Sequence, residues 1–173
     1  LYAKGLIEWD NTLDISESVS KTPELGRFIK SADEIRAESI ARRFFAKTPR
    51  LGVYGQLKAD STLFDGYAES ATDTDFDIAM IDGTSRLENT DRLKLASAFK
   101  PTTTKAALGG VYRISNTAAF KSEVRAGLGA KQISANGSYI VEDNADTEDV
   151  VEVTQLQDTK VLGWELVAQA EGV

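Results

Sequence analysis

The stretch SADEIRAESIARRFFAKTPRLGVYGQL, residues 31–57, contains the two patterns from which we predict the fold. Ser31 and Glu34 have the spacing of a capping box, and apolar residues then recur at helical spacing as far as Phe45. Pro49 ends this helix, because proline lacks a backbone N–H and clashes with the preceding turn. The apolar run that follows Pro49 is typical of a buried strand. We therefore predict a helix that leads directly into a buried strand.

The rest of the chain repeats this succession of helices and strands. Further strands are predicted at residues 75–82, 108–114 and 137–143, and further helices at 61–70, 90–99 and 117–129. Two more strand candidates lie outside the succession, at residues 5–9 and 160–169. The alternation indicates an α/β fold, in which a mixed, mostly parallel sheet is covered by helices and the terminal segments are β-rich.

We predict three parts along the chain. Residues 1–24 form an N-terminal strand and linker arm, residues 25–143 form the α/β core domain, and residues 144–173 form an acidic loop and a C-terminal β segment. Six acidic residues fall within residues 142–152, and we expect this loop on the solvent side, where like charges repel least.

The amino-acid composition argues against most enzymes. The chain has neither Cys nor His, which excludes disulfides, thiolate or imidazole metal ligands, and imidazole as a general base near pH 7. The formal net charge of −7 argues against a broad surface for nucleic acid, because such surfaces are rich in Lys and Arg. We therefore expect a protein that is not an enzyme.

Carboxylates are the remaining candidates for chemistry. Asp73, Asp75, Asp77 and Asp82 lie in DTDFDIAMID, and strand alternation places Asp75 and Asp77 on one face. Such a pair could hold Mg²⁺ or act in acid–base catalysis. A simpler interpretation makes Asp73 to Asp77 a polar loop and the frayed start of a strand. We favour it, because short motifs of this kind often occur by chance.

The stretch IAMIDGTSR, residues 78–86, resembles the start of a von Willebrand factor A-type domain, whose loop oxygens suit a divalent cation. Asp82 and Thr84 fit that pattern, but Arg86 stands where a hydroxyl is expected. We favour a turn at Asp82-Gly83. The two glycines of residues 108–113 lack the spacing of a dinucleotide fingerprint. We thus predict no catalytic, cofactor-binding or metal-binding residue, with a small metal-binding α/β domain or a carboxylate-based enzyme as the alternative.

The order of these features resembles a known family. Residues 31–55 resemble the helix-to-strand unit of contractile tail sheath proteins from phages and related injection systems. Residues 75–99 are similar to that family's next strand, loop and helix, and residues 160–173 to its closing strand and Gly-Val. The resemblance covers roughly residues 25–173. It departs from the family at residues 137–144 and 156–160, where Pro-containing segments are common.

The resemblance implies a structural virion protein, a tail sheath subunit that self-assembles into a contractile helical sleeve around a tail tube. Its implied partners are further copies of itself and the tail tube and baseplate proteins, with no nucleic acid, no cofactor and no direct membrane insertion. Its implied location is the phage tail, and the host cytoplasm during assembly. Phe44 and Phe45 would anchor the helix on the sheet. At least one of the terminal strands, which carry Trp9 and Trp164, is expected to lie against a neighbouring subunit or against a C-terminal domain that is not present in this chain, into which the resemblance implies that residues 144–173 lead.

Overall fold

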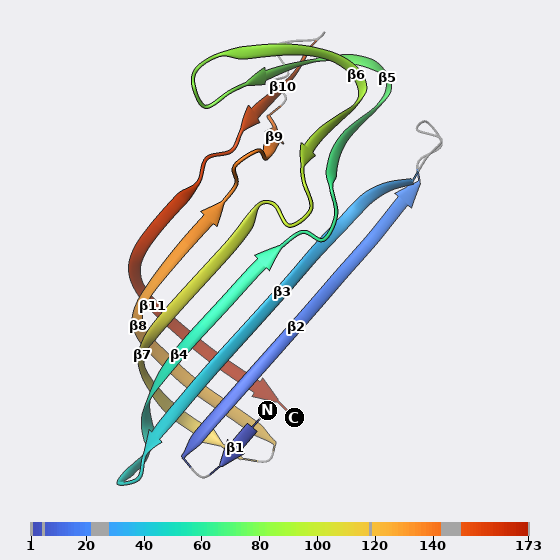
Figure 1. Ribbon diagram of the computed structural model, residues 1–173. Helices are drawn as coiled ribbons and strands as arrows, with labels where there is room; N and C mark the ends of the chain where they lie inside the picture. Colours follow the sequence, from blue (N-terminus) through green and yellow to red (C-terminus); the bar gives the residue numbers. More distant parts are fainter. Residues whose placement is uncertain (1, 5, 22–27, 118, 143–149, 173) are drawn as a thin grey trace.

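The computed structural model describes residues 2–4, 6–21, 28–117, 119–142 and 150–172 (Figure 1). All regular structure in this part of the chain is β, with eleven strands and no helix. The prediction of an α/β fold with a mostly parallel sheet was therefore wrong. No helix long and apolar enough to cross a membrane occurs among these residues.

Seven strands form one large antiparallel sheet in the order β1-β2-β3-β4-β7-β8-β11. Their bounds are β1 Tyr2–Lys4, β2 Ile7–Lys21, β3 Phe28–Phe45, β4 Thr48–Ser61, β7 Thr102–Asn116, β8 Phe120–Ser134 and β11 Thr159–Gly172. Six of the seven are long, at 14 to 18 residues each. In Figure 1 they run side by side and curve together, so that the sheet is strongly bent.

Four strands form a second, smaller sheet in the order β6-β5-β10-β9, which lies at one end of the large sheet (Figure 1). Their bounds are β5 Gly66–Ala79, β6 Ser85–Ala96, β9 Tyr139–Val141 and β10 Val150–Gln155. The pair β5 and β10 is parallel, whereas the other two pairs are antiparallel. Phe76, Ile78, Leu93 and Val153 form the buried core of this sheet.

The helix predicted from Ser31 to Pro49 is strand β3 and the turn after it. Ile40, Arg42 and Phe44 are buried, whereas Ala41 and Phe45 between and after them are exposed, which is the period of two of a strand. The spacing of four residues between Ile40 and Phe44 fits one face of a helix and one face of a strand equally well. The sequence pattern was therefore ambiguous, and pairing with β2 and β4 decides the outcome.

The other predicted helices are also replaced by loops and strands. Residues 61–70 contain the connection to β5 and its start, residues 90–99 lie largely in β6, and residues 117–129 lie largely in β8. Each predicted strand is confirmed in position by an overlapping strand, although β5 begins earlier than predicted and ends at Ala79. Of the acidic loop predicted at residues 142–152, residues 143–149 fall outside the described ranges, as does the boundary drawn after residue 143. Residues 150–152 belong to strand β10, so the loop does not extend that far.

Phe44 lies in the buried cluster of the large sheet, together with Tyr54, Ala107 and Val111. Its side chain is 3% exposed, which confirms the prediction that Phe44 is buried. Phe45 points to the opposite face and is 44% exposed, so the aromatic pair does not act as a joint anchor. The large and the small sheet therefore have separate apolar clusters.

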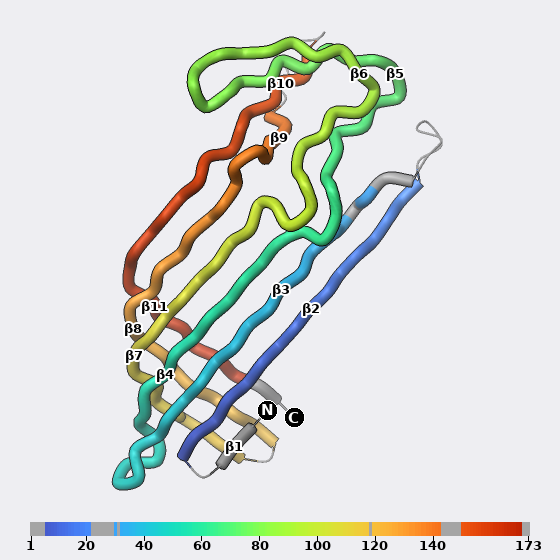
Figure 2. Tube along the Cα trace, viewed as in Figure 1, coloured from blue at the N-terminus to red at the C-terminus, as the bar shows by residue number. Residues whose placement is uncertain are grey.

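Glycines on β7 and β8 allow the large sheet to bend. Gly109 pairs with Gly127, and Tyr54 of β4 pairs with Gly109. A Cβ atom on Gly109 would lie 2.2 Å from the backbone oxygen of Ala126, and one on Gly127 would lie 2.1 Å from the backbone oxygen of Leu108. No side chain fits at either glycine without a backbone shift. The Cα trace in Figure 2 shows the bend that runs through β7, β8 and β11.

Candidate functional site

The large sheet has two faces of opposite character. One face, which we call the apolar face, carries four neighbouring cross-strand rows of mostly aliphatic and aromatic side chains. By register, the rows are Asn11-Ser39-Leu57-Ala106-Ala130-Leu162, Trp9-Ala41-Gly55-Leu108-Leu128-Trp164, Ile7-Arg43-Val53-Gly110-Ala126-Leu166 and Leu51-Tyr112-Val124-Ala168. Arg43 is the single charged residue in these four rows, all of which lie in the described part of the chain.

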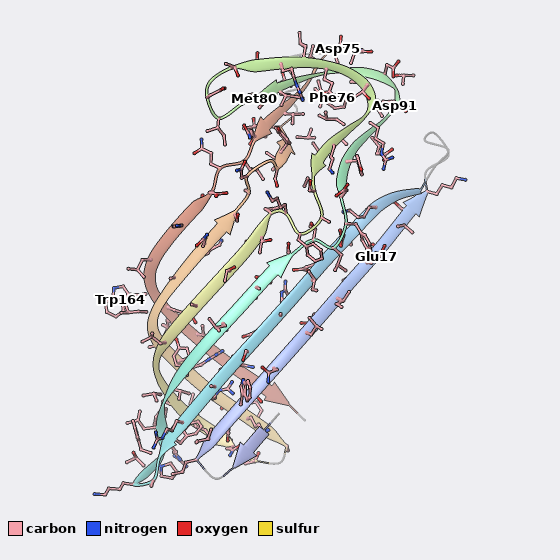
Figure 3. The ribbon with its side chains drawn as sticks, viewed as in Figure 1. Glu17, Asp75, Phe76, Met80, Asp91 and Trp164 are labelled. Carbon is pink, nitrogen blue, oxygen red and sulfur yellow. The ribbon has the colours of Figure 1, made fainter. Side chains whose placement is uncertain are left out.

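The apolar face is uncovered. Leu162, Trp164 and Leu166 of β11 are 80%, 89% and 77% exposed, and Leu108 of β7 is 67% exposed. Figure 3 shows Trp164 projecting from the outside of the curved sheet. Three further exposed aromatic residues lie near one end of the strands: Phe45, Tyr112 and Phe120. An apolar surface of this extent is unusual for a protein face in water.

The opposite face, which we call the polar trough, carries paired charges. Arg42 of β3 is 7% exposed, and its Nε donates to Oε1 of Glu123 on β8 at 2.9 Å. Its Nη1 donates to Asp10 of β2. Arg113 of β7 donates to Glu8 of β2. The pairs Arg42–Glu123 and Arg113–Glu8 connect strands that are three places apart in the sheet order, which shows that this face is concave.

The polar trough encloses an open cavity of about 810 Å³. Charged and amide side chains of six strands line it, from β2, β3, β4, β7, β8 and β11. They are Glu8, Asp10, Glu38, Arg42, Gln56, Arg113, Lys121, Glu123, Arg125 and Gln169. Two arginines stack on aromatic rings at its floor. Arg113 Cζ lies 3.9 Å from the centroid of Phe44, and Arg125 Cζ lies 5.5 Å from that of Tyr54. Cation–π contacts of this kind hold guanidinium groups in fixed positions.

The acidic candidates of the sequence lie in the small sheet, away from this trough. Asp75 and Asp77 lie on one face of β5, opposite Phe76 and Ile78, which confirms the alternation predicted for them. The interpretation of Asp73 to Asp77 as a polar loop and the frayed start of a strand was wrong, because β5 begins at Gly66 and these residues lie within it. Asp75 accepts a hydrogen bond from Asn89 at 2.6 Å. Within the described residues, no group of three acidic side chains is placed to hold a metal ion.

Asp82 lies in the turn between β5 and β6, as the sequence predicts. Its Oδ1 accepts hydrogen bonds from the Thr84 hydroxyl at 2.6 Å and the Thr84 backbone N–H at 3.0 Å. The hydrogen bond from the Thr84 side chain is the main cause that lowers the pKa of the Asp82 carboxyl. Gly83 has a φ of 83°, which glycine adopts readily. Arg86 forms a 2.8 Å ion pair with Glu88.

Sequence reasoning missed both faces of the large sheet. Arg42 and Arg125 were given no role, since their partners are distant in sequence: Arg42 and Glu123 are 81 residues apart. One signal for the apolar face was available in the sequence, because Leu162, Trp164 and Leu166 recur with a period of two. We predicted a strand there but did not assign these side chains to one face of a sheet. In comparisons with protein families, curated proteins and solved structures, nothing matches this chain. Functional inference therefore depends on the geometry of the two faces.

Proposed function

We propose that the large sheet is embedded in a lipid bilayer, with the apolar face toward the acyl chains and the polar trough toward water. The observation that carries the proposal is the exposed apolar face of the sheet, because the opposite, concave face buries both charged side chains and the cluster of Phe44, Tyr54, Ala107 and Val111. In a water-exposed antiparallel sheet, the apolar face packs on a core and the polar face is solvated. Here Arg42 and Arg125 are buried in the trough, whereas Leu162, Trp164 and Leu166 are exposed.

The strands of the large sheet are long enough to cross a bilayer. A strand that crosses a bilayer at a tilt needs roughly 9–11 residues, and the long strands of the large sheet have 14 to 18, of which the four apolar rows occupy residues 51–57, 106–112, 124–130 and 162–168 on β4, β7, β8 and β11. The apolar rows continue from β2 to β11 with the single charge of Arg43, and aromatic residues lie near one end. Continuous apolar bands with aromatic borders are typical of strands in membranes, where hydrocarbon contacts every outward position alike.

The proposal places a requirement on the sheet edges. Backbone N–H and C=O groups need partners within the hydrocarbon region, because no water is present there. Among the described residues, β11 pairs on one side with β8, and β1 covers only the first residues of β2. The embedded sheet thus requires additional strand pairing along β11 and β2. The small sheet, whose loops carry Asp65 and Asp82, lies outside the bilayer in this arrangement.

The tail sheath function stays a prediction, and we base no further argument on it. The resemblance depended on the helix-to-strand unit of residues 31–55, which is the hairpin of β3 and β4. The expectation of no direct membrane insertion, which also rested on the lack of a long uncharged apolar stretch, stays a prediction and is the alternative to the lipid proposal. The terminal strands contribute Trp9 and Trp164 to the apolar face, and the expected contact of such a strand with a neighbouring subunit stays a prediction.

The test uses the two tryptophans, the only ones in the chain. The full chain is reconstituted into phosphatidylcholine vesicles with and without bromine atoms on the acyl chains, which quench tryptophan fluorescence on contact. The Trp9→Phe variant reports on Trp164 alone. We expect strong quenching of Trp164 by brominated lipid and protection of Trp164 from aqueous iodide.

Two outcomes would contradict the proposal. Quenching of Trp164 by iodide, with no effect of brominated lipid, would place the apolar face in water. Protection from both quenchers, together with a dimer mass in light scattering, would show that a second copy of the chain covers the face.

A further inference from the structure

Three lysines lie side by side on the polar trough, in one cross-strand row near the end of β4 that leads into the small sheet. Lys58 of β4 pairs by register with Lys105 of β7, and Lys105 pairs with Lys131 of β8. Lys58 is two residues from Gln56, which lines the cavity, and Lys105 is two residues from the buried Ala107. Strand alternation therefore places the three side chains, which we call the lysine row, on the face of the trough.

The register places like charges directly opposite each other in the lysine row. Side chains in such positions of an antiparallel pair have Cβ atoms roughly 4.5–5.5 Å apart, and like charges there destabilise the sheet. Two contacts of this kind follow one another, between Lys58 and Lys105 and between Lys105 and Lys131. An arrangement that opposes folding in this way is expected at a functional site, where a bound anion compensates the repulsion.

The acids beside Lys58 already have other partners. Asp60 accepts a hydrogen bond from Arg36 Nε at 2.9 Å, and its Oδ1 lies 3.7 Å from Lys58 Nζ. Glu38, which lies directly opposite Lys58 on β3, accepts a hydrogen bond from Gln56 at 2.5 Å. An ammonium group has three N–H donors. Lys58 therefore has donors left for a ligand.

Lys105 and Lys131 are not neutralised by the protein. Both are exposed, and neither forms a hydrogen bond or an ion pair with a residue that the structure describes. Glu165 of β11 lies on the same face, with its Oε2 3.3 Å from the position that a Cβ atom of Gly129 would take, but it pairs with neither lysine. Two ammonium groups are therefore open to a solute in the trough.

We propose that the lysine row binds a small anion of the phosphate class, either free phosphate or a phosphate monoester. Lysine carries a compact charge on a long, flexible stem. Ammonium groups from three neighbouring strands, which lie roughly 4.8 Å apart, can therefore converge on one tetrahedral oxyanion. A phosphate with about two negative charges at neutral pH compensates the repulsion in the row better than a single carboxylate does. The inference does not depend on the membrane proposal, because the lysine row is on the other face of the sheet.

Calorimetric titration of the full chain tests this inference, in micelles of a non-ionic detergent and near neutral pH. The probes are inorganic phosphate and glycerol 3-phosphate, and the tighter of the two shows whether the site prefers the free ion or an ester. Acetate is the single-charge control, and chloride at matched ionic strength gives the effect of screening alone. We expect saturable 1:1 binding of at least one phosphate probe, and weaker binding of acetate and of chloride.

Two variants and a matched control locate the site. Lys105→Gln is expected to weaken phosphate binding roughly tenfold or more, because a charge-assisted hydrogen bond is lost. Lys131→Gln should also weaken it, and it supplies the test if Lys105→Gln does not fold. Lys160→Gln changes the net charge equally, but it removes an exposed lysine of β11 on the opposite face of the sheet, so it should leave binding unchanged.

A second measurement separates a binding site from a structural role. Without phosphate, Lys105→Gln should be more stable than the unchanged chain in denaturant unfolding, because it removes both like-charge contacts of the row. The same variant thus gains stability and loses binding. Equal effects of phosphate and chloride, equal losses of binding in Lys160→Gln and Lys105→Gln, a less stable Lys105→Gln, or no saturable binding would each overturn the inference.

Discussion

Trp9 and Trp164 lie in one cross-strand row of the large sheet, on β2 and β11, with four strands between them. Both are exposed on the apolar face, Trp9 at 49% and Trp164 at 89%. Trp9 Nε1 donates to Ser39 at 2.8 Å, which satisfies its polar atom on that face. The residues between the two tryptophans are Ala41, Gly55, Leu108 and Leu128, so the whole row is apolar. This row crosses the apolar face, for which we propose a lipid partner, from β2 to β11.

A charge placed in this row is expected to destabilise the sheet only in a bilayer. Leu128→Arg should lower the free energy of unfolding from vesicles by about 2–4 kcal/mol, the cost of arginine at mid-membrane depth. Gln132→Arg, two outward positions further along β8, is the matched control and should cost about 0–1 kcal/mol. The measurement is denaturant unfolding of both variants in vesicles. If both variants lower the free energy of unfolding by the same small amount, about 0.5 kcal/mol or less, the apolar face is exposed to water and the proposal is contradicted.

The glycine pair on β7 and β8 is expected to tolerate no side chain. Gly127→Ala places a Cβ 2.1 Å from the Leu108 backbone oxygen, so we expect a loss of about 1–3 kcal/mol or more in unfolding free energy. Gly163→Ala on β11 is the control, because its added Cβ meets no atom within 4 Å. The control should be neutral or stabilising, since alanine narrows the unfolded ensemble. Comparable losses in both variants would show that strand conformation, rather than the close approach, requires glycine.

Replacing Phe44 by alanine is expected to cost much more stability than replacing Phe45. Phe44→Ala removes a ring that is 3% exposed and that Arg113 covers, and it should cost about 3–5 kcal/mol of stability. Phe45→Ala removes a half-exposed ring of the opposite face and should cost less. Denaturant unfolding of the two variants side by side measures the difference. A larger cost at Phe45 would contradict the assignment of the faces.

The ion pair of Asp65 and Lys94, at the junction to the small sheet, is expected to loosen in acid. Asp65 accepts from Lys94 Nζ and from the Ala98 backbone N–H, both at 2.8 Å. The Lys94 hydrogen bond is the main cause that lowers the pKa of Asp65, and the same bond raises the pKa of Lys94. The contribution to stability is present above the usual Asp pKa, and it is lost as the pH falls through the lowered pKa.

Nuclear magnetic resonance checks this prediction. The Ala98 amide proton shift should titrate with a midpoint below 3.8, the ordinary pKa of Asp. The Asp65→Asn variant should abolish that titration, whereas the Thr84 amide, which reports on Asp82, should still titrate. A midpoint at or above 3.8 for Ala98 would contradict the pair.

The positions of the strands could be predicted from short-range sequence patterns, whereas the choice between helix and strand could not. Residues 51–57 and 160–169 are strands as predicted, because apolar runs rich in branched residues suit a sheet. The apolar spacing of residues 37–45 fits the period of a helix and the period of a strand. We predicted a helix because Ser31 and Glu34 have the spacing of a capping box. Neither residue caps anything in β3.

The absence of Cys and His, and the Asp82-Gly83 turn, were determined by the sequence alone, because composition and local turn chemistry require no distant partner. The faces were decided only by the tertiary structure. Arg42 is buried because the bend at Gly109 and Gly127 brings Glu123 across the trough to it. A period of two assigns residues to two faces, but it does not say which face curves inward. That choice depends on backbone pairing and ion pairs between residues far apart in the chain.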